Sequence, residues 1–298
     1  MRVDPFYVSS LVDALNQTQV NAQNLSQQLS SGAKIASLSE DPAGAGQNVL
    51  LLSQIQQDDS FTQSSNLVTG QLQVADSALG SVVSQLTQAI SLATSANNGT
   101  MSASNVKSIA NQISGILSEV QSLANTSYQG RYIFAGGQTA TAPFSTSNAV
   151  TGYSGDGNIN FLELPNGQKI QLNIPGDQVF LGSGTNSVFG ALNALVADFS
   201  SGTVNENQAA ADTGALNTAL NYVSQQRVTI DNSLTQLTSA ASAVSSEQTQ
   251  LTAAQSTLVQ ADLPTIATQL SLNQTQQSAL ESVIAELASP SNSLFNKM

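Results

Sequence analysis

The 298-residue sequence contains no cysteine, no histidine and no tryptophan, and only 9% of its residues are charged. Without cysteine the chain can form no disulfide, no thiolate nucleophile and no thiolate metal ligand. Without histidine it lacks the side chain that most often serves as a general base or a metal ligand. We therefore expect no enzyme activity, with no catalytic residue, no cofactor and no metal site.

The few charges are also unbalanced, with 7 basic and 19 acidic residues and a formal net charge of −12. The sequence has no basic cluster that could release counterions from a phosphate backbone, so we expect no binding to nucleic acid. Serine, glutamine, asparagine and threonine supply the polarity instead. A surface of these residues tolerates close packing against copies of itself, which fits a protein that assembles.

Long apolar runs are missing as well. The start of the chain, MRVDPFYVSSLVDALN, has no continuous apolar segment of the kind found in cleaved secretory signals, and no later segment is typical of a transmembrane helix. We expect no membrane association. The chain is expected either to stay in the cytoplasm or to be exported without a cleaved signal peptide.

Paired carboxylates are the remaining route to catalysis. The pairs are Glu40-Asp41, Asp58-Asp59 and, further apart, Asp156 with Glu163. Adjacent residues on a helix point about 100° apart and do not converge on a substrate, so capping or solvated roles are expected. Asp156 lies in YSGDGN, which offers too few oxygens for calcium and indicates a tight turn.

The abundant feature is heptad spacing of apolar residues, which buries one narrow seam between long helices. The N-terminal part carries three such stripes, of which the first comprises Leu11, Leu15, Thr18, Ala22, Leu25 and Leu29. Later stripes run from Val68 to Ala93, from Val106 to Leu123, from Leu216 to Leu251 and from Ile266 to Leu287. For the central stripes, packing within one chain explains the pattern. At the two ends the seams are sparser, and folding coupled to assembly is the alternative.

Polar residues interrupt the C-terminal seams, among them Arg227, Asn273 and Gln277. Asn273 and Gln277 either fix the register of a helix pair or face a solvated stretch, and the sequence favours neither interpretation. Arg227 is expected to extend its head group to water or to pair with a nearby acid.

Local signals divide the helices. Ser31-Gly32 ends the first helix, and Ser39 or Asp41 caps the next, which has Pro42 in its first turn. Asn97-Asn98-Gly99 indicates a turn before a third helix from about 104 to about 125. The heptad register slips at Asp262-Leu263-Pro264.

The middle of the chain, about 128–185, is different. Two extended runs flank Pro165-Asn166-Gly167, which predicts a β-hairpin. Tyr132-Ile133-Phe134 and Val179-Phe180-Leu181 are expected to be short strands, and a short amphipathic helix is expected at 188–199.

The predicted fold class is α+β: an elongated antiparallel α-helical coiled-coil rod from the N- and C-terminal segments, with a small β-rich domain inserted in the middle. The predicted assembly helices at the two ends are 1–35 and 263–298. The predicted rod segments are 36–127 and 203–262, and the predicted insert is 128–202.

Several motifs resemble the flagellin family. The run Leu29 to Ile35, the run Ser39 to Ala43, and Ala96 to Thr100 are similar in order and spacing to the flagellin N-terminal signature. In the middle, Gly130-Arg131-Tyr132-Ile133-Phe134-Ala135-Gly136 is similar to the hook–filament junction members of the superfamily, and flagellin itself is the alternative. The ending Lys297-Met298 departs from the apolar ending that the family often shows.

The resemblance implies an extracellular structural subunit of the bacterial flagellum. It implies a homo-oligomeric ring, a hook-associated protein on the hook side, flagellin on the filament side, and a cytoplasmic export chaperone on the C-terminal helix. The residues expected to form the assembly interface are the apolar residues near the two ends: Leu11, Leu15, Leu25, Leu29, Ile266, Leu270, Leu280, Ile284, Leu287, Leu294 and Phe295.

Two interpretations from other classes stay open at this point. The middle module can be a carbohydrate-binding or enzymatic head on a coiled-coil stalk, although few aromatics are available to stack on sugars. The chain can also be a coiled-coil scaffold of the cytoplasm.

Overall fold

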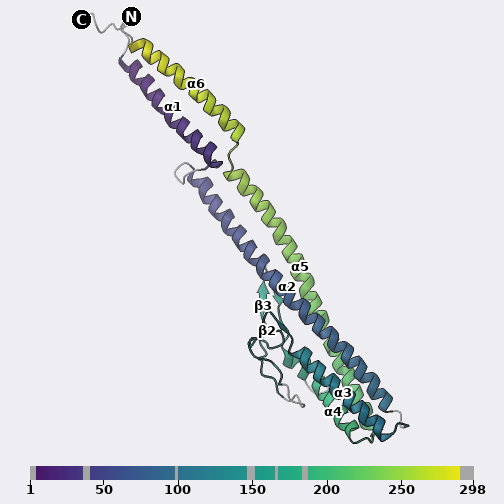
Figure 1. Cartoon of the computed structure of the whole chain (residues 1–298). Helices are drawn as coiled ribbons and strands as arrows, with labels where there is room; N and C mark the ends of the chain where they lie inside the picture. The colour runs from purple at the N-terminus through teal and green to yellow at the C-terminus, as the bar shows by residue number, and fades with distance from the viewer. Residues whose placement is uncertain are drawn as a thin grey trace, which may run out of the picture. The chain divides into compact units, whose positions relative to one another are not determined.

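The computed structural model of the chain describes residues 5–35, 41–97, 100–145, 152–164, 167–182 and 187–288. These residues are mostly helical, with two small two-stranded antiparallel sheets (Figure 1). They form two compact units: unit 1 comprises residues 1–59 and 245–298, and unit 2 comprises residues 60–244. The elements are α1 (Pro5–Ser31), α2 (Pro42–Ala96), α3 (Ala103–Ala124), β1 (Ser127–Tyr128), β2 (Arg131–Tyr132), β3 (Phe161–Glu163), β4 (Lys169–Gln171), η1 (Asp177–Leu181), α4 (Val188–Ser200), α5 (Glu206–Val259) and α6 (Leu263–Ala288).

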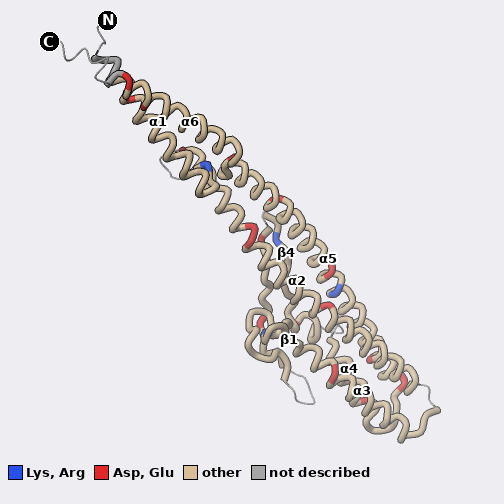
Figure 2. Tube along the Cα trace, turned by 45° about the horizontal axis from the view of Figure 1, so that its top comes forward, with Lys and Arg blue, Asp and Glu red and all other residues tan. Residues whose placement is uncertain are grey.

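Unit 1 contains a pair of antiparallel helices, α1 and α6, which lie side by side in Figures 1 and 2 and pack along their length. One end of the pair is tied by backbone hydrogen bonds. The Lys34 amide donates to the Val259 carbonyl at 2.7 Å, and the Ala261 amide donates to the Gly32 carbonyl at 3.0 Å. The residues that follow α1 are therefore fixed to the break between α5 and α6.

The predicted helix ends are confirmed where the structure describes them. Gly32 ends α1 with a φ of +67°, a left-handed conformation that glycine adopts without a side-chain clash. Asp41 caps α2, because its Oδ1 accepts from the Gly44 amide at 2.9 Å. The predicted register slip at Asp262-Leu263-Pro264 coincides with the break before α6, where Asp262 Oδ1 accepts from the Thr265 amide at 3.4 Å. The predicted cap Ser39, the turn residues Asn98 and Gly99, and the chain ending Lys297-Met298 lie outside the described residues.

Unit 2 contains a helical core to which α2, α3, α4 and α5 all contribute. The heptad residues of α2 and α5 point into it, and Leu79, Val82, Leu86, Leu216 and Val223 are fully buried. α3 begins at Ala103, after the N-cap Ser102, and ends at Ala124, within a residue of the prediction. α4 matches the predicted short amphipathic helix and is capped by Ser187.

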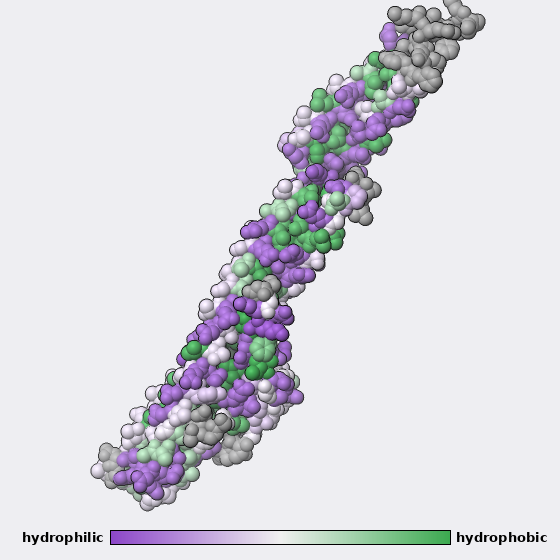
Figure 3. Space-filling model, turned by 180° about the vertical axis from the view of Figure 1, so that it is seen from behind, coloured by the Kyte–Doolittle hydropathy of each residue, from purple (hydrophilic) through white to green (hydrophobic). Residues whose placement is uncertain are grey.

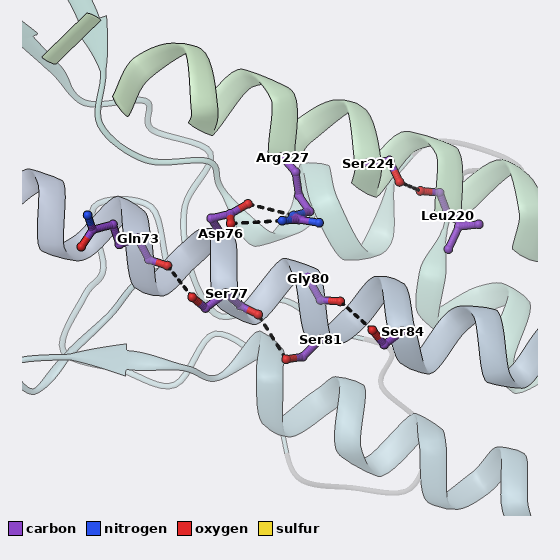
Figure 4. A network of polar contacts seen from close by, with 9 residues as sticks. All are labelled: Gln73, Asp76, Ser77, Gly80, Ser81, Ser84, Leu220, Ser224 and Arg227. Carbon is purple, nitrogen blue, oxygen red and sulfur yellow. Dashed lines mark hydrogen bonds and ion pairs between the residues drawn. The ribbon is translucent and has the colours of Figure 1, made fainter. Parts of the chain in front are cut away.

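An ion pair joins α2 to α5 inside unit 2. The guanidinium of Arg227 donates from Nε to Asp76 Oδ1 at 2.8 Å and from Nη2 to Asp76 Oδ2 at 3.1 Å (Figure 4). The guanidinium lies beside Gly80, one turn further along α2, where a Cβ would be in ordinary van der Waals contact with it at 3.5 Å. The prediction that Arg227 pairs with an acid is confirmed, and the bidentate geometry is the strong form of such a pair.

The middle of the chain contains the predicted hairpin. β3 pairs with β4 in antiparallel register, with Leu162 opposite Ile170. Gly167, at the end of the turn, has a φ of +80°, while Pro165 and Asn166 lie outside the described residues. An aromatic cluster holds the module together. The ring centroid of Phe180 lies 5.3 Å from that of Phe134, 5.5 Å from that of Phe144 and 5.6 Å from that of Phe189.

The strand predicted at 132–134 is only partly correct. β2 comprises Arg131 and Tyr132, and the chain then turns. The Phe134 carbonyl accepts from the Gly176 amide at 2.7 Å and from the Tyr153 hydroxyl at 2.8 Å, so loop groups satisfy it rather than a neighbouring strand. At Gly136, with a φ of +66°, a Cβ would lie 2.0 Å from the Asp156 carbonyl oxygen, so only glycine fits this turn.

The strand predicted at Val179-Phe180-Leu181 is wrong. The segment is η1, a single π-helical turn closed by the Gly182 amide, which donates to the Asp177 carbonyl at 2.8 Å. Val179 and Phe180 are adjacent and both fully buried. A helical turn allows this because consecutive side chains lie about 100° apart, whereas a strand sends them to opposite faces.

Candidate functional site

The α1–α6 pair is the candidate functional site, because it contains the apolar residues that the sequence predicts for assembly. The structure places them along the seam between the two helices. Ile266 is buried, Leu29 is 38% exposed, and the others whose side chains are described are half-buried: Leu11, Leu15, Leu25, Leu270, Leu280 and Ile284. Leu294, Phe295 and the side chain of Leu287 lie outside the described part of the chain. The seam residues thus hold α1 against α6, but two helices alone leave most of them partly exposed.

The seam also contains polar groups. Thr18 is buried and its hydroxyl donates to the Ala14 carbonyl of its own helix at 2.7 Å. Asn273 is only 9% exposed, and its Oδ1 is buried without a hydrogen-bond partner in the described part of the chain. Gln277 is half-buried and donates to Glu281 at 3.0 Å. Of the two open interpretations, Asn273 therefore fits the buried seam position, while Gln277 is bonded on its own helix.

Two grooves follow the pair. We call the first the amide groove; it has a volume of about 390 Å³ and is lined by Asn21, Asn24, Leu25, Gln269, Leu272, Asn273 and Gln276. We call the second the serine groove; it has a volume of about 590 Å³ and is lined by Ala22, Gln23, Ser26, Gln27, Ser30, Ser31, Leu270 and Gln274. At about 100° per residue, the two sets fall on opposite flanks of the seam. Neither lining contains a charged residue.

Several apolar side chains of unit 1 point away from the seam, and the sequence analysis did not single them out. On the α1–α6 pair these are Val12, Val20, Leu263, Leu272 and Val283, which are 41%, 50%, 43%, 60% and 42% exposed. On α2 they are Val49, Leu50 and Leu52, at 63%, 72% and 39%. Figure 3 shows hydrophobic residues in small patches among hydrophilic ones on the face that it draws. An apolar residue next to a seam position, such as Leu272 before Asn273, was the sequence signal that could have indicated these exposed side chains.

The acids of the three carboxylate pairs have different surroundings, and Glu40 lies outside the described residues. Asp156 accepts from the amides of Gly137 and Asn158, and the Gly137 bond in particular holds its pKa below the usual range, which confirms a turn. Asp58, expected to be solvated, is instead only 6% exposed, so that prediction is wrong. Burial, followed by the charges of Glu247 and Asp59, raises the pKa of Asp58.

Metal and membrane features are missing from the described part of the chain. No group of three or more acidic side chains there is arranged to hold a metal ion. None of its helices combines the length and hydrophobicity needed to cross a bilayer. Charged residues are scattered thinly along the trace (Figure 2).

Comparisons with known proteins identify the N-terminal helices. Residues 8–139 match the family model described as the bacterial flagellin N-terminal helical region. A curated relative, flagellar hook-associated protein 3 of Salmonella typhimurium, is 26% identical over 178 residues, which are 59% of this chain and 56% of the relative. The protein of the same name from Escherichia coli is 26% identical over 175 residues, 58% of this chain and 55% of the relative. The chain thus spans a little over half the length of the curated relatives that it matches.

The fold has solved counterparts. The crystal structure of flagellar hook-associated protein-3 from Legionella pneumophila aligns with a TM-score of 0.62 at 15% identity, covering 70% of this chain and 98% of that one. At this identity the likeness concerns the fold alone. The family match over residues 8–139 confirms the resemblance found in the N-terminal motifs. Residues 8–139 are therefore similar to the bacterial flagellin N-terminal helical region.

Proposed function

We propose that this chain is a structural subunit of the bacterial flagellum that forms the junction between hook and filament. The observation that carries the proposal is its similarity to two curated proteins, both named flagellar hook-associated protein 3. The match to a flagellin N-terminal region by itself fits the filament subunit equally well. The relatives' names favour the junction.

The proposed mechanism is mechanical. The N- and C-terminal segments pair as an antiparallel coiled-coil rod, and the middle module is an insert. The assembly helices are 1–35 and 263–298, the rod segments are 36–127 and 203–262, and the insert is 128–202. The half-buried seam of the α1–α6 pair supports an assembly role for Leu11, Leu15, Leu25, Leu270, Leu280 and Ile284. The same role is proposed for Leu29, Ile266, Leu287, Leu294 and Phe295. A helix pair with a sparse seam gains most of its stability when neighbours cover it.

The proposed partners follow from this role. Copies of the chain form a ring, a hook-associated protein binds on the hook side, and flagellin binds on the filament side. A cytoplasmic chaperone holds the C-terminal helix before export, which proceeds without a cleaved signal peptide to the extracellular flagellum. The subunit has no enzyme activity and needs no cofactor.

Immunogold electron microscopy of isolated hook–filament structures tests the proposal. Labelling confined to the boundary between hook and filament is expected. Labelling along the filament would instead identify the filament subunit, and unlabelled structures from cells that produce the protein would reject a flagellar role.

Deletion of residues 263–298 tests the role of the α1–α6 pair. The truncated protein is expected to retain the circular-dichroism melting of unit 2, because that core contains no residue of α6. It is expected not to enter hook–filament structures. A truncated subunit that still forms functional junctions would show that α6 is dispensable for assembly.

A further inference from the structure

The amide groove is polar, uncharged and incompletely satisfied. Its lining combines five amide side chains with Leu25 and Leu272, and Leu272 is 60% exposed. Asn273, which lines it, is more than nine-tenths buried and has an Oδ1 with no hydrogen-bond partner among the residues that the structure describes. A buried acceptor without a donor is unfavourable, so such groups are normally satisfied by a ligand, water or another chain.

The chemistry of the groove selects its occupant. A charged partner would lose its hydration among neutral amides with no counter-ion to replace it. A wholly apolar partner would leave the amides of the groove unpaired. The suitable occupant presents hydroxyl or amide donors beside small apolar contacts, on a surface that carries no charge.

The opposite flank of the α1–α6 pair has this chemistry. In the serine groove α1 presents Gln23, Ser26, Gln27 and Ser30, and all four are exposed. These side chains carry N–H and O–H groups, which are donors of the kind that the Oδ1 of Asn273 requires. The two flanks are different surfaces, so a contact between them is head-to-tail and continues into a ring or helix instead of closing as a dimer.

We propose that the amide groove of one copy receives the α1 flank of a second copy, formed by Gln23, Ser26, Gln27 and Ser30, with Asn273 as the central hydrogen-bond acceptor. The proposal rests on the proposed function and names the surface through which like subunits meet. Burial of Leu272 supplies the apolar part of the contact, and Asn273 sets its register, as a buried asparagine does in coiled coils.

Cysteine cross-linking tests the contact cleanly, because the chain has no cysteine of its own. The full chain carrying Gln276→Cys in the amide groove and Gln27→Cys on the other flank is produced in cells that lack the native copy. Their isolated flagella are then oxidised. The double variant is expected to give a ladder of dimers, trimers and higher species, since each subunit links to two neighbours. Each single variant is expected to remain monomeric, as is the control pair Gln276→Cys with Ser118→Cys, where Ser118 is an exposed residue of α3.

The outcomes separate this proposal from the proposed function. Flagella that contain the double variant without a ladder would overturn the head-to-tail contact and leave the junction role intact. A dimer from Gln276→Cys alone would also overturn it, because it would show a symmetric contact. Flagella that lack the protein altogether would overturn both.

Substitution of Asn273 tests the acceptor itself. Asn273→Asp adds a charge to an uncharged groove and is expected to lower the cross-linked fraction of the double-cysteine chain at least tenfold. Asn232→Asp, the same change at an exposed position of α5, is expected to have no effect. The Asn273→Leu monomer is expected to melt at the same temperature as the native monomer or at a higher one. In the double-cysteine chain, Asn273→Leu is also expected to abolish the cross-linked ladder. Retention of the ladder by both Asn273 variants would show that Asn273 only packs α6 against α1.

Discussion

The α1–α6 pair of unit 1 and the helical core of unit 2 use the same heptad spacing but bury their seams to different extents. In unit 2, Leu79 and Leu86 have no exposed surface, because residues of α3, α4 and α5 share one core with those of α2. In the α1–α6 pair, Leu11 and Leu280 are half-buried, and Leu29 is 38% exposed. Heptad spacing therefore shows which side of a helix faces inward. The number of elements that cover that side decides how much surface is buried.

The largest expected effect is a matched pair of leucine truncations. Leu86→Ala is expected to lower the free energy of unfolding by about 3 kcal/mol, because it removes a fully buried side chain and leaves a cavity. Leu280→Ala is expected to cost less than about 1 kcal/mol in the free subunit, because that side chain is half-buried already. Urea denaturation monitored by circular dichroism measures both. Equal losses would show that the α1–α6 pair is as well packed as unit 2.

Two acids that each have a buried carboxylate oxygen, one in each unit, give the next largest effect. In unit 2, burial, followed by a hydrogen bond to Asp212 and its charge, raises the pKa of Asp198 to about 6. In unit 1, burial and the charges of Glu247 and Asp59 raise the pKa of Asp58. A raised acid pKa means that the folded state binds more protons, so stability falls as pH rises from the ordinary value of 3.8 to the raised one.

Asparagine variants measure this effect. Asp198→Asn is expected to stabilise the subunit at pH 7 by about 1 kcal/mol and to flatten its stability between pH 4 and about 6. Asp58→Asn is expected to act in the same direction. Exposed Asp13→Asn serves as the control and is expected to change neither quantity. Thermal melts across this pH range measure both variants. If Asp198→Asn and the native chain melt alike at every pH, the pKa of Asp198 is not raised in the folded state.

A smaller effect is expected at the ion pair of unit 2. Arg227→Ala is expected to cost about 1 kcal/mol, since Arg227 and Asp76 are both partly exposed, with side chains 34% and 25% accessible. A double-mutant cycle with Asp76→Ala isolates the interaction. A coupling energy of zero would mean that the pair contributes nothing to the register of α2 against α5.

Local signals explain what the sequence predicted well. Gly32 and Asp41 each define a helix end through their own backbone conformation or side chain, so no knowledge of the rest of the fold is needed. The hairpin was predictable for the same reason, since its turn residues and flanking strands are adjacent in the sequence.

The wrong predictions depended on distant neighbours. Val179-Phe180-Leu181 is too short for periodicity to separate a strand from a helical turn, and Phe134, Phe144 and Phe189 decide its conformation. Asp58 is buried because α2 turns that face inward, which adjacent acids in a sequence do not reveal. The amide groove required the pairing of α1 with α6, because its two walls come from opposite ends of the chain.

Hydrogen exchange of the backbone amides, in the free subunit and in isolated hook–filament structures, tests the central claim most directly. In the free subunit, amides of α1 and α6 are expected to exchange with opening free energies at least about 2 kcal/mol below those of α3, because their seam is sparse. In assembled structures the protection of α1 and α6 is expected to rise strongly, while that of α3 stays the same. Equal protection of α1, α6 and α3 in the free subunit, with no change on assembly, would contradict the assignment of the α1–α6 pair as the assembly surface.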